Sequence, residues 1–550
     1  MSLKYLFSRF VLPLAALTLM AMPARARFVN LSDLPKTVAF KDAISKLEKD
    51  AKDKDAVAAI KKAADAGDKD AQFAYAFALQ SGLGGLEAPK DKPNALLDEA
   101  KALYKKAADA GQPSALNNLA LLKIATNDDV KGAIASIEDA ANSGNGRAKI
   151  TLAEMYLEGI GVEKSPEASL RWLQRADAAE KNEATYLIAL ISEAAKDEAG
   201  AVTNLLKAAE NGYLPAMIYL GNKIINGKGD QPNIEEARKW FTKAIEAGAP
   251  AAKVNLGVIS EVEAAIEENK GKDADKTKVA DFYKKALGYY QEAAELKVGE
   301  AFNKLGFYHE KGLGVTKDEA KAYEWYKKGA DAGVGVSIYN VAVLNEEGRG
   351  VKEKSSAEAL KYFYTAAKGG LPDAQVALAE RYRSGKNGLD KDPIAAMAWM
   401  EKAAQAGNMG AQLQLANMLE TGEAGFVNLK TAAELYVDAA KKGSPIAMFQ
   451  IADMAEKGRG LARDLVQAYG FLSACAKITK NDENFGKQAA DKLADLKKKM
   501  SPEELKKGEE FLKQLIGENN TAAPAATTPA APSNTKPATT PAKDDKKKPK

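Results

Sequence analysis

The chain has almost no cysteine and almost no histidine. Among its 550 residues there is one cysteine, Cys475, and one histidine, His309. A single cysteine cannot close an internal disulfide or build a thiolate zinc site, and a single histidine cannot supply paired imidazoles. These absences exclude most metal centres and catalytic triads, and we expect the protein to carry no cofactor.

The chain also lacks a surplus of charge of one sign. Its 79 basic and 75 acidic residues give a net charge of +4. Residues 521–550 contribute +4 and residues 1–26 contribute +3, so the part between them is near −3. Binding of nucleic acid needs basic charge to neutralise phosphates. The balance therefore predicts that nucleic acid is not a partner.

The N-terminus has the order of residues that is typical of an export signal. Lys4 and Arg9 precede an apolar run from residue 10 to residue 22, and small residues follow at Ala24 and Ala26. A run of this length is too short to cross a hydrocarbon layer of about 30 Å as a helix. The order predicts a cleavable signal peptide, and the alternative is a retained amphipathic anchor.

Cleavage of residues 1–26 would leave a mature chain that begins at about Arg27 and is periplasmic or secreted. No later window approaches the roughly 18 apolar residues of a membrane helix, so we expect no integral membrane segment. At the other end, residues 519–550 are rich in alanine, proline, threonine and lysine. They predict a disordered tail, whose lysines suit a weak attachment to an anionic envelope surface.

Between these ends the sequence repeats with a period of about 36 residues. The sixth residue of every unit is alanine or glycine, as expected where two helix backbones approach closely. A glycine-rich turn follows in most units, and then a second apolar pattern. Each unit therefore predicts a pair of helices, and their repetition predicts an all-α solenoid. The eleven units open at Ala71, Ala115, Ala148, Ala184, Ala216, Ala252, Ala301, Ser337, Ala374, Ala411 and Ala447.

Helical segments are expected to cover both ends of the repeats. Residues 41–66 predict one helix before the first unit, and Ser501, Pro502 and Glu504 form the pattern of a helix start after the last one. Two stretches lengthen the period and are interpreted as insertions, at residues 82–94 and 263–278. The predicted domains are the signal peptide 1–26, an N-terminal cap 27–70, the repeats 71–475, C-terminal capping helices 476–518 and the tail 519–550.

The unit at residues 301–333 resembles a Sel1-like repeat, a relative of the tetratricopeptide repeat. It contains AFNKLG, GLGV and KAYEWYKKGA, which follow the family pattern AxxxLG, GxGV and KAxxWYxKAA. Residues 148–176 and 216–248 also resemble it, and the resemblance covers roughly residues 56–475. It implies a right-handed superhelix whose first helices line a concave groove that binds proteins or peptides. Exported bacterial members of the family resemble adaptors in signalling, polysaccharide export or host contact.

One cysteine-rich branch of this family is associated with β-lactam binding or hydrolysis. The paired cysteines of that branch are absent here, and no SxxK motif is followed by KTG. His309 stands where other units carry Tyr156 or Tyr382, and Cys475 lies in an apolar helical pattern, so both are interpreted as packing residues. We therefore predict a scaffold without enzymatic activity. The alternatives are a secreted enzyme of the β-lactam-hydrolysing type and a cell-wall adaptor tethered by the basic tail.

Helical periodicity also predicts which residues line the groove. The fifth, sixth, eighth and ninth positions of a unit serve packing, so the third, seventh and tenth positions form another strip. Its apolar residues would form a floor and its glutamates an acidic edge, which suits a protein or peptide with basic and apolar residues. The alternative is a solvated helix face without a ligand. The candidate partner-binding residues are Glu193, Glu261, Phe307, Glu310, Tyr339, Val343, Glu346, Glu420 and Glu456.

Overall fold

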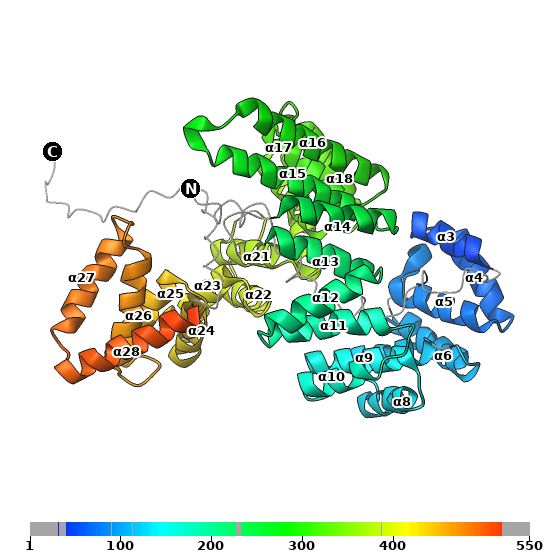
Figure 1. The fold of residues 1–550 in the computed structure, drawn as a ribbon, viewed down its shortest axis with the longest axis horizontal. Helices are drawn as coiled ribbons and strands as arrows, with labels where there is room; N and C mark the ends of the chain where they lie inside the picture. Colours follow the sequence, from blue (N-terminus) through cyan, green and yellow to red (C-terminus); the bar gives the residue numbers. More distant parts are fainter. Residues whose placement is uncertain are drawn as a thin grey trace, which may run out of the picture. The chain divides into compact units, whose positions relative to one another are not determined.

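The computed structural model describes residue 31 and residues 40–89, 91–112, 114–226, 233–386 and 388–519. These residues form twenty-six α-helices, α3 to α28, and contain no β-strand (Figure 1). The predicted signal peptide lies outside the described residues, and so does the predicted tail after residue 519. The all-α fold that the sequence predicts is confirmed.

Each of the eleven predicted units forms two helices. The first helices are α5 (Lys69–Ser81), α7 (Ala115–Ala125), α9 (Gly146–Glu158), α11 (Lys181–Ala194), α13 (Leu214–Ile225), α15 (Ala252–Glu268), α17 (Gly299–Lys311), α19 (Gly335–Glu347), α21 (Pro372–Ser384), α23 (Met409–Thr421) and α25 (Pro445–Lys457). The second helices are α6 (Ala95–Asp109), α8 (Val130–Asn142), α10 (Pro166–Gln174), α12 (Glu198–Glu210), α14 (Ile234–Glu246), α16 (Lys276–Glu295), α18 (Glu319–Asp331), α20 (Ser356–Lys368), α22 (Pro393–Gln405), α24 (Leu429–Lys441) and α26 (Leu465–Ile478).

The small sixth residue of a unit lets its two helices touch. All eleven of these residues are buried. A β-carbon at Gly306 of α17 would lie 2.5 Å from the Tyr326 ring of α18, and one at Gly221 of α13 would lie 2.7 Å from the Phe241 ring of α14. An aromatic side chain of the second helix therefore occupies the space that a larger sixth residue would need.

The glycine-rich turn within a unit packs against the preceding unit. Gly350 follows α19 with a φ of 65°. A β-carbon there would lie 2.0 Å from the carbonyl oxygen of Glu319, the first residue of α18. Gly460 after α25 makes the same close approach to Leu429, the first residue of α24. Only glycine permits this contact, because any side chain would collide with the backbone of the neighbouring helix.

The described residues divide into two compact regions, each larger than a repeat unit. The boundary between them lies between Ser260 and Glu261, within α15. The insertion expected at 263–278 lengthens the surrounding helices, since α15 has 17 residues and α16 has 20. A short 3-10 helix, η4 (Gly271–Asp273), joins them. The earlier insertion contains η3 (Leu83–Gly85). Each insertion thus lies between the two helices of its own pair, α5 and α6 or α15 and α16.

The N-terminal segment differs from the prediction of one helix over residues 41–66. It forms α3 (Lys41–Lys49) and α4 (Lys54–Asp65). The chain is extended at Asp50, and the Asp53 carboxylate accepts a hydrogen bond of 2.9 Å from the Ala56 backbone N–H. This cap begins a new helix, which explains why the single helix was a wrong prediction.

Two helices, α27 (Phe485–Lys497) and α28 (Pro502–Asn519), follow the last pair. The predicted start of α28 is confirmed, because the Glu504 backbone N–H donates to Ser501 Oγ and the Ser501 backbone N–H donates to the Glu504 carboxylate. α28 packs closely on α26, where a β-carbon at Gly470 would lie 2.2 Å from the Phe511 ring. This contact covers the apolar face of the final pair.

Candidate interaction surface

From α17 onwards, the first helices present the predicted strip as half-buried side chains. Phe307 of α17 and Tyr339 and Val343 of α19 are half-buried, whereas Leu305 and Val341 at the fifth position are buried. From the unit at Ala301 onwards, the third and seventh positions are half-buried in every unit, as the helical period predicts. Earlier units bury several of these positions, including Phe73, Leu121 and Ile150. Residues of the strip lie between the core and the solvent, where they can both pack and contact a partner.

Aromatic rings in and beside the strip are accompanied by the chain's own basic side chains. The Tyr339 ring lies 5.6 Å from the ring of Phe363 in α20, and the Arg381 guanidinium of α21 lies 3.8 Å from the centre of the Phe363 ring. Lys311 Nζ lies 5.8 Å from the centre of the Phe307 ring. Cation–π contacts of this kind favour a fixed position of each basic side chain.

Each candidate glutamate forms an ion pair within the chain. Glu261, Glu310, Glu420 and Glu456 have side chains that are at most 13% exposed. The sequence predicts an acidic edge, but these basic partners neutralise it within the chain. Partner binding by the glutamates stays a prediction. The pairs are Glu193–Lys223, Glu261–Lys304, Glu310–Arg349, Glu346–Arg381, Glu420–Arg459 and Glu456–Lys499.

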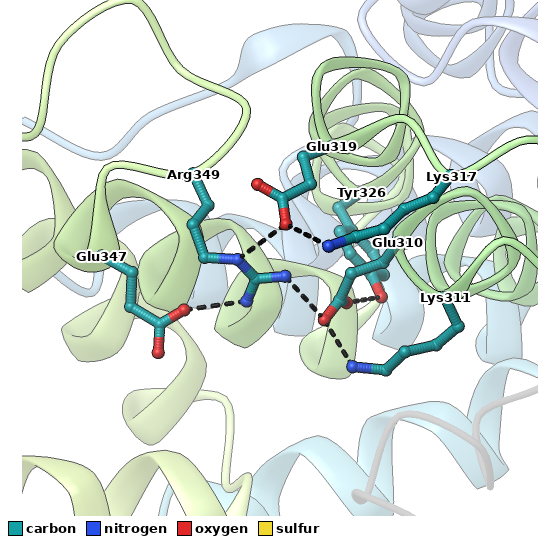
Figure 2. Close-up of polar contacts among 7 residues, drawn as sticks. All are labelled: Glu310, Lys311, Lys317, Glu319, Tyr326, Glu347 and Arg349. Carbon is teal, nitrogen blue, oxygen red and sulfur yellow. Dashed lines mark hydrogen bonds and ion pairs between the residues drawn. The ribbon is translucent and has the colours of Figure 1, made fainter.

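Figure 2 shows the Glu310–Arg349 pair and the residues around it. Arg349 lies in the turn after α19. The guanidinium donates to Glu310 at 3.0 Å, to Glu319 at 3.3 Å and to Glu347 at 2.8 Å. Donating these hydrogen bonds raises the pKa of Arg349, and the bond to Glu347 contributes most. The Tyr326 hydroxyl donates to the other oxygen of Glu310 at 2.9 Å (Figure 2). The network therefore joins α17, α18 and the end of α19.

The Glu310 carboxylate remains ionised although it is largely buried. Burial opposes its charge, but hydrogen bonds from Lys311, Arg349 and Tyr326 outweigh this cost, and the pKa of Glu310 is lowered. Lys311 Nζ lies 2.8 Å from the carboxylate (Figure 2). The side chain is thus fully engaged in contacts between neighbouring helices.

The same arrangement recurs three units later. Arg459, in the turn after α25, lies 2.9 Å from Glu420 and 2.8 Å from Asp453. The Tyr436 hydroxyl of α24 donates to Glu420 at 3.2 Å. Neither arginine was among the residues predicted from the sequence. The sequence signal that could have identified them is the GRG turn at residues 348–350 and 458–460. In both places the arginine is the thirteenth residue of its unit, and the preceding unit has a glutamate at its tenth position.

His309 and Cys475 pack in the core as the sequence predicts. His309 is 8% exposed, and burial lowers its pKa. Cys475 is fully buried, and burial raises its pKa to about 11. In the described ranges, no group of three or more histidine, cysteine, aspartate and glutamate side chains is arranged to hold a metal ion. No helix in these ranges is both long and apolar enough to span a membrane.

The family model of the Sel1 repeat matches more than half of the chain. The chain belongs to the Sel1 repeat family. Proteins of this family are generally protein-interaction scaffolds and generally not enzymes. The helix pairs α7–α8 and α11–α12 fall outside the matched stretches, and their units lack the glycine-rich turn. The matched residues are 69–112, 148–176, 214–248, 271–298, 300–334, 335–371, 372–408, 410–444 and 445–476.

Two curated proteins illustrate the range of the similarity. The chain is 31% identical over 137 residues to an uncharacterized protein of Neisseria meningitidis serogroup B, covering 25% of this chain and 26% of that protein. It is 28% identical over 253 residues to chitin synthase regulatory factor 3 of Schizosaccharomyces pombe, covering 43% of this chain and 26% of that protein. The matches thus span about a quarter of the length of each relative.

Solved structures of Sel1-type proteins are also similar to this chain. The antigen c5321 of uropathogenic Escherichia coli, which displays an SLR fold, is 24% identical with a TM-score of 0.40, covering 87% of this chain and 99% of that chain. A Sel1 repeat protein of Oxalobacter formigenes is 22% identical with a TM-score of 0.38, covering 66% of this chain and 90% of that chain.

Proposed function

We propose that this protein is an exported scaffold without enzymatic activity that binds a protein or peptide through the strip on its first helices. The observation that supports this most is the recurrence of half-buried side chains at the same positions of successive units, as at Phe307, Tyr339 and Val343. A surface that repeats along a solenoid suits a partner that extends over several units. In an exported chain, such a scaffold would act in envelope signalling or polysaccharide export.

The ion pairs change how this surface would recognise a partner. Because Glu310, Glu346 and Glu420 already have basic partners, they provide little free negative charge. The apolar residues would therefore supply most of the affinity, and the fixed pairs of opposite charge would set the orientation of the partner. Basic groups of the partner would compete with the chain's own arginines.

The test starts with the purified mature chain and an envelope fraction, from which mass spectrometry identifies a stoichiometric partner. That partner is then titrated calorimetrically against the double variant Phe307→Gln, Val343→Thr. We expect at least about tenfold weaker binding with unchanged helix content, because contact residues of a hot spot each contribute about 1 kcal/mol or more.

The matched control replaces apolar residues that are exposed elsewhere, Ile394→Thr and Ile478→Gln. These side chains are 66% and 54% exposed on α22 and α26. Capture of a protein alone does not support the proposal. Equal loss of affinity in both variants, or unchanged affinity in the strip variant, would show that the partner binds another surface.

A further inference from the structure

The turn between α23 and α24 carries two adjacent apolar side chains that are exposed. Phe426 is 50% exposed and Val427 is 58% exposed. At Gly425, directly before them, a β-carbon would have no atom within 4 Å apart from those of its chain neighbours. The tip of this turn is therefore uncovered in the described part of the chain.

These two residues depart from the pattern of the corresponding turns. In five other units the residue before the N-cap of the second helix is basic and exposed, and here it is Val427. The turn itself is similar, since a β-carbon at Gly312 would lie 3.2 Å from Lys317 and one at Gly422 would lie 2.8 Å from Val427. Folding of the turn therefore does not require an apolar residue at this position. The five basic residues are Lys164, Lys317, Lys354, Lys391 and Arg463.

Ion pairs hold the turns of successive units side by side along one edge of the repeats. Each pair joins the end of one first helix to the end of the next first helix or to the turn that follows it. Arg383 Nε at the end of α21, for example, lies 2.6 Å from the Glu423 carboxylate in the turn after α23. All of these residues belong to the region that begins at Glu261. The pairs are Glu310–Arg349, Glu346–Arg381, Arg383–Glu423 and Glu420–Arg459.

A third exposed apolar side chain lies on this edge. Ile394, in the first turn of α22, is 66% exposed. The turns after α19 and α25 approach the first residue of the preceding second helix, which is Glu319 or Leu429. The repeat predicts the same contact between the turn after α23 and the start of α22. We call Ile394, Phe426 and Val427 the turn patch.

Unpaired lysines surround the turn patch. Five exposed lysines on this edge have no carboxylate at ion-pair distance within the described ranges. The exposed carboxylates of the same turns are Glu353, Asp390 and Asp392, so the excess of positive charge is small. The apolar side chains therefore provide most of the attraction to a ligand, and the lysines favour a ligand with a negative surface. The five lysines are Lys352, Lys354, Lys386, Lys391 and Lys430.

We propose that the turn patch attaches this protein to the surface of an anionic phospholipid bilayer. The three apolar side chains enter the boundary between head groups and acyl chains, and the lysines stay among the head groups. A bilayer accepts side chains that project from a turn, whereas a protein partner needs a matching recess. A second copy of the chain would bring the same lysines together, and like charges oppose that contact. The attachment does not depend on the strip proposed above.

The experiment measures cosedimentation of the full mature chain with vesicles of equal parts phosphatidylcholine and phosphatidylglycerol. Phe426→Thr, Val427→Lys gives this turn the residues that the turn after α17 has at the same positions. We expect at least about tenfold weaker binding, although the variant gains a positive charge, because the apolar contact with the acyl chains is lost. The matched control Leu296→Thr, Val336→Lys makes the same change of charge at exposed apolar residues outside these turns and should bind normally.

A second variant, Lys386→Gln, Lys391→Gln, Lys430→Gln, tests the contribution of charge. It should weaken binding about threefold or more at low salt and little at high salt, because salt screens exposed charges. Vesicles of phosphatidylcholine alone should bind the unmodified chain more weakly than the anionic vesicles do. The matched control removes exposed lysines at the ends of α16, α20 and α24, through Lys297→Gln, Lys368→Gln and Lys441→Gln.

Every variant keeps residues 521–550, so the lysines of this segment cannot account for a difference between variants. Melting curves should show that all variants fold. The proposal is overturned if Phe426→Thr, Val427→Lys binds vesicles as the unmodified chain does, if a control loses as much affinity, or if neutral vesicles bind equally well. Binding of an acidic protein through this edge, without binding of vesicles, would also overturn it.

Discussion

Gly306 and Glu310 lie one helical turn apart on α17, and both contact Tyr326 of α18. The ring packs over the glycine, and the hydroxyl donates to the glutamate at 2.9 Å. The small sixth residue and the acidic tenth residue of this unit therefore hold the same aromatic side chain. Packing thus accounts for the glutamate at this position without any ligand, while the half-buried apolar residues beside it remain free to contact one.

This contact predicts opposite effects for two glycine substitutions. Gly306→Ala should lower the free energy of unfolding by about 1–3 kcal/mol, because the new methyl group would collide with the Tyr326 ring. Gly288→Ala, within α16, should raise it by roughly 0.5–1 kcal/mol, because nothing lies within 4 Å of the new β-carbon. Chemical denaturation of both variants measures these changes. Destabilisation of the same size in both would contradict this account of the sixth position.

At the scale of helices, charged contacts fix α27 against the last repeat. Asp453 of α25 forms ion pairs with Lys492 of α27, with Lys457 and with Arg459. Burial opposes its charge, but hydrogen bonds from Lys457 and Lys492 outweigh this and lower the pKa of Asp453 to about 2 from its ordinary value of 3.8. The folded state therefore binds this proton less readily than the unfolded state does.

The lowered pKa predicts how attachment of α27 depends on pH. The stabilisation should be fully present above pH 3.8 and should disappear as the pH falls towards 2. Asp453→Asn should therefore reduce hydrogen-exchange protection of α27 at about pH 5, by an equivalent of about 1–2 kcal/mol, and should change it little near pH 2. The control is Asp495→Asn, which removes an exposed pair with Lys498. Equal effects of both substitutions would argue against a specific role for Asp453.

At the scale of the whole molecule, the helices that contact each other extensively are mostly neighbours in the chain. Each pair therefore depends on the pairs beside it, and the ends of each run need covering helices. α28 does this for the last pair through Phe511. Because the helices contact mainly their neighbours in the chain, folding can begin in one helix pair and extend to the next.

The N-terminal sequence predicts that the protein is exported and where its mature form begins. Mass spectrometry of the chain recovered from an envelope or secreted fraction should give Arg27 as the first residue, because Ala24 and Ala26 suit a signal peptidase. Leu17→Arg should block processing by interrupting the apolar run, and the full-length chain should accumulate inside the cell. The conservative control Leu17→Ile should be processed normally. Recovery of an uncleaved chain from the unmodified gene would refute the export signal.

The helix pairs could be predicted from the sequence because the information that defines them is local. A small residue recurs at the sixth position of every unit, a glycine-rich turn follows in most of them, and helical geometry converts this spacing into a packed face. The capping pattern at Ser501 and Glu504 was predictable for the same reason. The break between α3 and α4 was missed because it depends on whether the Asp53 side chain caps a helix or faces solvent.

The tertiary structure alone decided which charges are free. Glu310 and Arg349 are 39 residues apart, and helical periodicity gives the face of a residue but not the side chain that reaches it from the next unit. Periodicity thus determined the repeated architecture, and contacts between repeats determined which charged side chains are paired.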